Sequence, residues 1–220
     1  MTETRRLYYE DVYKKEFTAT VVECRERKKG YEVILDESAF YPEGGGQPSD
    51  VGILGDAKVT EVHEKDGELL HYTDKALEVG AKVEGKIDWA HRFDLMQQHS
   101  GEHMVSGIIH AKYGYDNVGF HMGSDVITVD LNGMLDEAQL AEIEQEVNER
   151  VWEDKEVQIT YPTAEELKTL DYRSKKELTG QVRIVTFPGV DVCACCGTHV
   201  THTGEIGMVK LLSVVKFRDG

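Results

Sequence analysis

Two short pairs of metal-binding side chains, far apart in the sequence, place the strongest constraint on how this chain folds. His99 and His103 lie four residues apart in a stretch predicted to be helical, so both side chains project from one helix face. Cys195 and His199 repeat this spacing near the end of the chain, with a thiolate and an imidazole. Neither pair can complete a tetrahedral site alone. The sequence therefore predicts a zinc site that only the folded chain assembles.

The donors in these pairs, three imidazoles and one thiolate, match the preference of Zn²⁺ for four nitrogen and sulfur ligands. Cys193 and Cys196 are alternative thiolates, but only Cys195 pairs with His199 at a four-residue step. Four protein ligands are typical of a structural zinc site, whereas a catalytic site keeps one position for water or substrate. The sequence leaves that choice open.

Bulk properties favour a soluble protein with one large domain or two small ones. The 220 residues are 40% hydrophobic and 30% charged, which is ordinary for a globular chain. No apolar run approaches the roughly 18 residues that span a bilayer, and no signal peptide is recognisable. Three of the four cysteines are clustered, which suits metal binding better than a disulfide framework. The expected compartment is cytoplasmic.

The net charge of −16 argues against extensive binding to a phosphate backbone. Two local basic clusters still leave room for a small contact with nucleic acid, although solvated surface is their simpler interpretation. The clusters are Arg25, Arg27, Lys28 and Lys29, and then Arg173, Lys175 and Lys176.

The predicted architecture is α+β in two domains, residues 1–88 and 89–220. In the first, partly alternating segments at 17–22, 31–35, 57–62 and 82–87 predict a small barrel or sandwich of short strands. The second opens with a helix from Arg92 to about Tyr113, stopped by Gly114. Further expected elements are strands at 126–131, 182–187 and 206–211, a helix capped by Asp136, and a short helix opened by the capping box at 163–166. A sheet with helices on one face would surround the zinc site, where the central helix passes the Cys/His loop.

A glycine-rich segment at 41–50 reads Tyr-Pro-Glu-Gly-Gly-Gly-Gln-Pro-Ser-Asp. Gly44, Gly45 and Gly46 can adopt positive φ and allow close approach of another surface. The segment lacks the Gly-Lys-Ser/Thr ending of a nucleotide-triphosphate loop, so on its own it indicates a turn.

The stretch His99-Ser-Gly-Glu-His103 also satisfies H-x-x-E-H, a zinc-peptidase pattern in which the glutamate is the general base. This alternative explains Glu102 but leaves Cys195 and His199 without a role. The simplest interpretation of Glu102 is an exposed helix residue.

The ordered motifs Glu-Gly-Gly-Gly-Gln (43–47), His-x3-His (99–103) and Cys-Cys-Gly-Thr-His (195–199) together resemble the editing domain of alanyl-tRNA synthetase. They are still more similar to its free-standing relatives, the AlaX trans-editing proteins. The resemblance covers nearly the whole chain and includes Asp88-Trp89 ahead of the helix and the segment 118–123. The N-terminal strand domain suggests the medium or longer form of that family.

The resemblance implies a zinc-dependent aminoacyl-tRNA deacylase that removes a wrong amino acid, chiefly serine and as a second candidate glycine, from alanine tRNA. It implies that His99, His103, Cys195 and His199 hold Zn²⁺, and that Gln47 and the three glycines meet the aminoacyl end. The expected partner is the tRNA acceptor end, without a membrane. Longer relatives continue beyond 217–220, so a homodimer through a C-terminal region absent here is a further expectation.

An editing site must spare alanine, which is smaller than serine, so it must require the hydroxyl group rather than exclude by size. Thr128 and Asp130, on the strand after the central helix, are the predicted pocket residues, although ordinary strand positions explain each of them singly. Two other functions stay open: editing of seryl-tRNA for threonine, whose enzymes share the histidine and Cys/His pairs, and a non-catalytic binding module stabilised by zinc.

Overall fold

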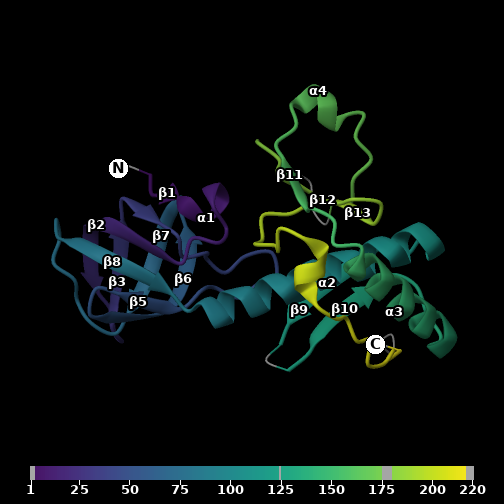
Figure 1. The fold of residues 1–220 in the computed structure, drawn as a ribbon. Helices are drawn as coiled ribbons and strands as arrows, with labels where there is room; N and C mark the ends of the chain where they lie inside the picture. Colours follow the sequence, from purple (N-terminus) through teal and green to yellow (C-terminus); the bar gives the residue numbers. More distant parts are fainter. Residues whose placement is uncertain (1–2, 124, 175–179, 217–220) are drawn as a thin grey trace. The chain divides into compact units, whose positions relative to one another are not determined.

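The computed structural model describes residues 3–123, 125–174 and 180–216, and the chain divides into two compact units, Met1–Leu95 and Met96–Gly220. Helix α2 (Trp89–Tyr113) begins in the first unit and continues through the second (Figure 1). It starts three residues before the predicted helix and ends where Gly114, at φ +69°, stops it as expected. Within the described residues, no helix combines the length and apolar character that a membrane span requires.

Six described strands of the first unit close into a barrel in the order β2-β3-β7-β6-β5-β8, which confirms the predicted barrel-like fold. Alternation explains why: along β2, Phe17, Ala19 and Val21 are buried while the residues between them face outward. The barrel strands are β2 (Glu16–Glu26), β3 (Tyr31–Leu35), β5 (Gly52–Leu54), β6 (Ala57–Lys65), β7 (Glu68–Thr73) and β8 (Lys82–Ile87). Ahead of or between them lie β1 (Arg5–Arg6), α1 (Leu7–Glu10) and β4 (Glu37–Ser38).

The β6–β7 hairpin shows how local chemistry sets the register of the barrel. Asp66 and Gly67 have φ values of 53° and 83°, the pair of positive angles that a two-residue type I′ turn needs. The turn therefore pairs Lys65 with Glu68 and fixes the ladder that follows.

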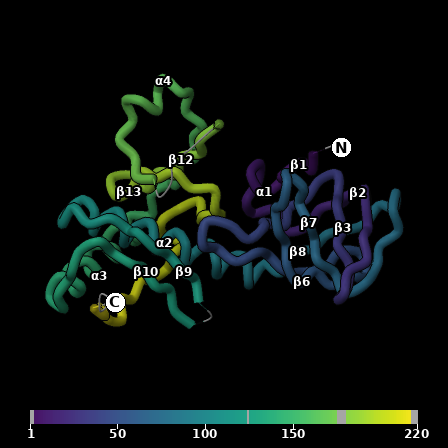
Figure 2. The backbone as a smooth tube through the Cα atoms, turned by 180° about the vertical axis from the view of Figure 1, so that it is seen from behind, coloured from purple at the N-terminus to yellow at the C-terminus, as the bar shows by residue number. Residues whose placement is uncertain are grey.

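The second unit is α+β, and its described strands form two separate sheets. A hairpin joins β9 (Asn117–Met122) to β10 (Ile127–Leu131), and an antiparallel sheet has the order β11-β12-β13. The sheet strands are β11 (Gln158–Thr160), β12 (Ile184–Phe187) and β13 (Asp191–Ala194), and the remaining elements are α3 (Glu137–Trp152), α4 (Ala164–Leu167) and η1 (Thr203–Ile206). Figures 1 and 2 both show the segment with α4 reaching out from β11 and β12. Asp136 caps α3 as predicted, through a full capping box, and the predicted capping box at Thr163 also forms.

The strand predicted at 206–211 is wrong. Thr203–Ile206 forms a 3-10 turn, and from Gly207 to Lys216, the last described residue, no residue joins a ladder. Side chains of α3 take the place of a neighbouring strand. Asn148 pairs with both the N–H and the C=O of Val209, at 2.9 and 2.8 Å, and Glu144 accepts the N–H of Leu211 at 2.7 Å. Because the backbone is satisfied in this way, the apolar pattern of the segment does not require a sheet.

Candidate metal centre

The four predicted ligands meet in the second unit. His99 and His103 lie one turn apart on α2, and Cys195 and His199 follow β13. One ligand atom from each of the four lies within 4.8 Å of every other, and the three histidines are each at most 3% exposed. The fold thus assembles in one place two pairs that the sequence keeps far apart, and the group could hold a metal ion.

The distances within this group fit a tetrahedral ion better than a set of ordinary hydrogen bonds. The Sγ atom of Cys195 lies 3.6 Å from Nε2 of His99 and 3.5 Å from Nε2 of His199. Zinc bonds of about 2.3 Å to sulfur and about 2.0 Å to nitrogen, at tetrahedral angles, separate those two atoms by roughly 3.5 Å. The donor types and their spacing therefore both suit Zn²⁺.

The opposite ring nitrogens have protein partners that orient two of the imidazoles. Nδ1 of His103 donates to Oδ2 of Asp191 at 2.9 Å, and Nδ1 of His199 lies 3.2 Å from Oγ of Ser100. Ser100 also accepts the N–H of Val200 at 3.1 Å, which ties the Cys/His segment to α2. A carboxylate or hydroxyl at the outer nitrogen is the usual arrangement around a metal-bound histidine, because it fixes the proton on Nδ1 and leaves Nε2 for the ion.

Electrostatics distinguish Cys195 from its neighbours. Burial alone would raise the pKa of the Cys195 thiol, but His99, His103 and His199 hold that pKa well below its ordinary value. The N–H of Gly197 also points to its Sγ atom, at 3.3 Å. By contrast, burial raises the pKa of Cys193 to about 11. Cys196 is exposed. Cys195 is therefore the thiolate of the cluster, in agreement with the pairing that the sequence favoured.

Three residues at the centre were missed by sequence reasoning: Ser100, Phe120 and Asp191. The Phe120 ring stacks on the His99 ring, with centroids 5.3 Å apart and planes at 25°. Ser100 and Phe120 stand inside motifs that were recognised, but nothing in those motifs assigns them a role. Asp191 carries no sequence signal, since only the fold brings it to the outer nitrogen of His103.

Thr128 and Asp130, the predicted pocket residues, are exposed on β10. They pair across the hairpin with His121 and Gly119, whereas the neighbouring pair of Phe120 and Val129 occupies the face that contacts His99. The structure therefore does not bring Thr128 or Asp130 together with the four ligands, and their contact with a substrate stays a prediction.

Glu102 is not the exposed helix residue that the sequence suggested: only 4% of it is accessible. Its Oε1 atom accepts hydrogen bonds from Ser106 Oγ and Asn117 Nδ2, both at 2.5 Å, because β9 covers this side of α2. The peptidase alternative expects a carboxylate as third metal ligand, whereas Cys195 and His199 complete the candidate group with His99 and His103 here.

The glycine-rich segment forms a two-residue turn in the first unit. Gly44 and Gln47 exchange two backbone hydrogen bonds of 3.0 Å, and between them Gly45 and Gly46 have φ values of 63° and 86°. Positive φ is thus confirmed at Gly45 and Gly46 but not at Gly44, and these two angles require glycine or a residue of similar freedom. Gln47 is fully buried. Its predicted place beside a substrate stays a prediction.

A buried ion pair locks the base of this segment onto the start of α2. Arg92 donates to both carboxylate oxygens of Asp50 and to the carbonyl groups of Val12 and Ala39, and the exposed fraction of Arg92 and Asp50 is 0%. Asp50 in turn accepts the N–H of Tyr41 at 2.6 Å, so the two ends of the segment are held together. Burial of these two charges is tolerated because each of them has several hydrogen-bond partners.

In both predicted basic clusters the arginines make contacts within the protein. Arg25 contacts Glu23, Glu32 and Glu68, and Arg27 lies over the Tyr72 ring at 4.1 Å. Lys28 and Lys29 are exposed at the turn that follows. In the second cluster the Arg173 side chain is mostly buried and bound to Asp191, while Lys175 and Lys176 lie outside the described residues.

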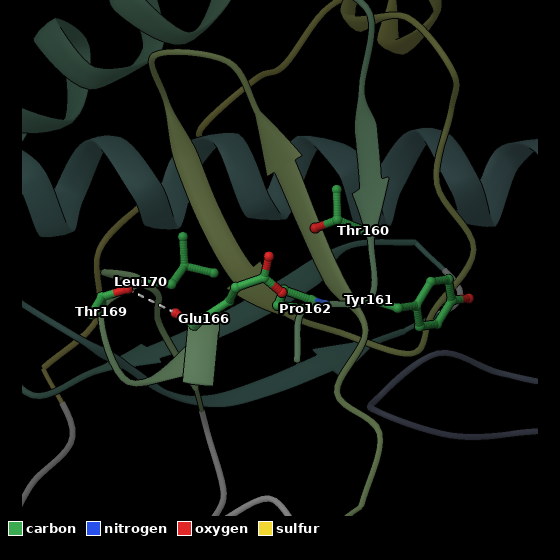
Figure 3. A pocket seen from close by; sticks show the side chains of 6 residues that line it. All are labelled: Thr160, Tyr161, Pro162, Glu166, Thr169 and Leu170. Carbon is green, nitrogen blue, oxygen red and sulfur yellow. Dashed lines mark hydrogen bonds between the residues drawn. The ribbon is translucent and has the colours of Figure 1, made fainter. Parts of the chain in front are cut away.

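A hollow of about 480 Å³ lies beside α4, away from the ligand group (Figure 3). Its lining residues are Thr160, Tyr161, Pro162, Glu166, Thr169 and Leu170. Thr169 Oγ1 donates to the backbone carbonyl of Glu166, and the walls offer a single carboxylate, so the hollow has little chemistry of its own.

Comparisons with known proteins point in one direction. Residues 182–220 match the family model described as threonyl and alanyl tRNA synthetase second additional domain, and residues 2–91 match that of class II (A) tRNA synthetases. The chain is 33% identical to the mouse alanyl-tRNA editing protein Aarsd1 over 94% of its own length, and 36% identical to AlaX-L of Pyrococcus horikoshii over 96%. It spans 54% of the length of each of these relatives. It is also 37% identical to part of the alanine–tRNA ligase of Methanobrevibacter smithii, of which it covers 26%.

Proposed function

We propose that this chain, which is similar to alanyl-tRNA editing proteins over at least 94% of its own length, is a trans-editing hydrolase that releases a wrong amino acid from alanine tRNA. The substrate we propose is chiefly seryl-tRNA, with glycyl-tRNA second. The observation that carries the proposal is the meeting of three imidazoles and one thiolate in one buried cluster, at the residues that the motifs single out.

We propose Zn²⁺ as the cofactor, held by His99, His103, Cys195 and His199. Bound there, the ion would supply a Lewis acid for the ester carbonyl or a water of lowered pKa. The protein's own part is to hold the ligands in place. Asp191 and Ser100 orient two imidazoles, and the thiolate of Cys195 is stabilised by the N–H of Gly197. Such preorganisation is what a hydrolytic site requires of its scaffold.

We propose that the partner is the acceptor end of the tRNA rather than its body. The net charge of −16 opposes a wide phosphate interface, and the ion pairs of Arg25 and Arg173 further reduce the positive surface on offer. Binding should therefore be weak, with a shallow dependence on salt. The turn at Gly45-Gly46 presents backbone without side chains, which suits close contact with an aminoacyl-adenosine end.

The test is deacylation of seryl-, glycyl- and alanyl-tRNA for alanine, and of seryl-tRNA for threonine, by the purified metal-loaded chain. We expect serine to be released from alanine tRNA and alanine to be spared, with activity lost after chelation and restored by Zn²⁺. Cys195→Ala should abolish the activity, while Cys196→Ser, a change of the adjacent exposed thiol, should retain it.

Each other result has a definite meaning. Release from threonine tRNA alone would replace the proposal by the sister editing activity, which shares the family model at residues 182–220. A folded, zinc-loaded chain that releases no amino acid from any of the four substrates would contradict the proposal and favour a structural metal site. Full activity in Cys195→Ala would remove the cluster from the reaction.

A further inference from the structure

Asp191 joins one metal ligand to an arginine that is remote in sequence. Its Oδ2 atom accepts from Nδ1 of His103 and from Nη2 of Arg173, each at 2.9 Å, and its Oδ1 atom accepts from Nε of Arg173 at 2.7 Å. Asp191 is 5% exposed, and the side chain of Arg173 is 13% exposed. Hydrogen bonds therefore connect Arg173 through Asp191 to His103, and we call these three residues the relay.

The backbone holds both ends of this relay in place. Asp191 is the first residue of β13, and Arg173 pairs with the same strand in a parallel bridge to Cys193. The N–H of Arg173 donates to Val192 O at 2.8 Å, and its carbonyl accepts the N–H of Ala194 at 2.9 Å. Because its main chain is fixed along β13, the Arg173 side chain can reach the carboxylate two residues before the bridge.

We propose that Asp191 and Arg173 are positioning residues of the metal centre, which hold His103 in the tautomer and orientation that direct Nε2 to the ion. Neither residue belongs to the group of His99, His103, Cys195 and His199. This inference rests on the metal-binding part of the proposed function and is independent of the substrate. It gives Arg173 a task inside the protein, in place of the contact with tRNA that its basic cluster suggested.

The two residues have different tasks in the relay. A carboxylate at Nδ1 keeps the proton on that atom, so Nε2 carries the lone pair that a metal needs. A buried carboxylate is costly unless it is paired, and Arg173 pairs it through two parallel N–H donors that also fix its plane. Lysine cannot reproduce this geometry, because its ammonium group is a point charge without the fork of donors.

The experiment measures metal affinity rather than catalysis. Asp191→Asn and Arg173→Lys are titrated with Zn²⁺ against a chromophoric chelator of known affinity, and the Co²⁺ forms are compared by their visible absorption. We expect Asp191→Asn to weaken the affinity by about 10- to 100-fold and to change the Co²⁺ spectrum, and Arg173→Lys to weaken it by less.

Two matched controls use similar pairs away from the cluster. Asp116→Asn changes a carboxylate that also accepts from a histidine Nδ1 at 2.9 Å, that of the exposed His110. Arg150→Lys changes an arginine that is paired with Glu153 on the surface of α3. Both controls should bind Zn²⁺ as the parent does.

Metal-free samples of all variants are compared by circular dichroism and thermal unfolding, so that loss of fold is separated from loss of affinity. Should Asp191→Asn not fold, Arg173→Lys alone decides. The proposal is overturned if every folded variant among these two binds Zn²⁺ with parental affinity and gives a parental Co²⁺ spectrum. Because no tRNA is used, failure of the deacylation assay leaves this result unchanged, and failure here leaves the deacylation result unchanged.

Discussion

Two groups of residues built around buried histidines, one around His71 in the barrel and one made of the four ligand residues in the second unit, differ in what the ring nitrogens meet. In the barrel, His71 is fully buried, and both its nitrogens have protein partners: Ser38 Oγ lies 2.7 Å from Nε2, and the carbonyl of Val33 lies 3.0 Å from Nδ1. In the second unit, His199 contacts Ser100 through Nδ1, but its Nε2 faces the sulfur of Cys195. Burial alone therefore does not separate a core histidine from a ligand, whereas the partner of the second nitrogen does.

The two groups also differ in charge. Burial lowers the pKa of His71 to about 4, so at neutral pH it is an uncharged part of the core. The second group contains an anionic sulfur, because the surrounding imidazoles hold the pKa of Cys195 low. The protein thus completes the first group by itself, while the second has the donors and the charge that suit a cation.

The largest expected difference between the groups appears on metal removal. Binding that favours only the folded state adds RT ln(1 + [L]/Kd), which is about 4 kcal/mol at a thousandfold excess over Kd. We expect chelation to remove stabilisation of that order from the second unit and little from the barrel. Hydrogen exchange measures this directly: amides of β12 and β13 should lose protection, while those of β3 and β7 keep theirs.

Cys195→Ala should show this loss of protection with or without Zn²⁺, and Cys196→Ser should respond as the parent does. Equal loss of protection in both units, or no loss in either, would contradict the distinction between a group completed by the protein and one completed by a metal.

The features that could be predicted from the sequence are those that depend on local patterns of residues. The i, i+4 spacing of His99 and His103 and the alternation in β2 depend on helix and strand geometry alone, so both were predicted correctly. The same holds for the helix cap at Asp136. The four residues of the ligand group could be named from the two motifs, on the assumption that the fold brings the motifs together.

The failures depend on contacts between distant segments. The predicted strand at 206–211 is replaced by contacts with Asn148 and Glu144, which no local pattern could reveal. Glu102 is buried because β9 covers it, and Arg173 serves Asp191 rather than the surface. Polar residues at the outer nitrogens of ligands have no characteristic spacing, because each comes from whichever segment the fold places there.

The second prediction uses acid to disturb the barrel group. In the unfolded chain His71 is protonated below its ordinary pKa of about 6.5. In the folded barrel its pKa is about 4, so it stays neutral until the pH falls to that value. Stability from this residue is therefore complete above pH 6.5 and is lost as the pH falls. The loss is about 2 kcal/mol at pH 5 and approaches about 3 kcal/mol near pH 4. Denaturant unfolding at pH 7 and pH 5 measures it.

Because carboxylates also titrate in acid, the informative quantity is the difference between the parent and His71→Asn. This variant should be less stable than the parent at pH 7 and should lose about 2 kcal/mol less on going to pH 5. An unchanged slope in His71→Asn would show that the barrel histidine is not held neutral.

The smallest expected effect tests how tightly α2 packs against the start of β13. Gly107 lies one turn after His103, and a Cβ atom added there would meet Val190 O at 2.5 Å and Asp191 Cβ at 2.7 Å. Gly107→Ala must therefore push the helix and Asp191 apart, at a cost of about 1–3 kcal/mol, of which the better helix propensity of alanine returns up to about 1.

Gly101→Ala is the matched control, since its Cβ would meet only methyl groups, the nearest at 3.3 Å. We expect Gly107→Ala to lower both the thermal midpoint and the affinity for Zn²⁺, Gly101→Ala to change neither by much, and the acid response of His71 to be the same in both. If Gly107→Ala bound Zn²⁺ as tightly as the parent, the contact between α2 and Asp191 would not be what aligns His103. The contrast between the two histidine groups would then depend on the ligand residues alone.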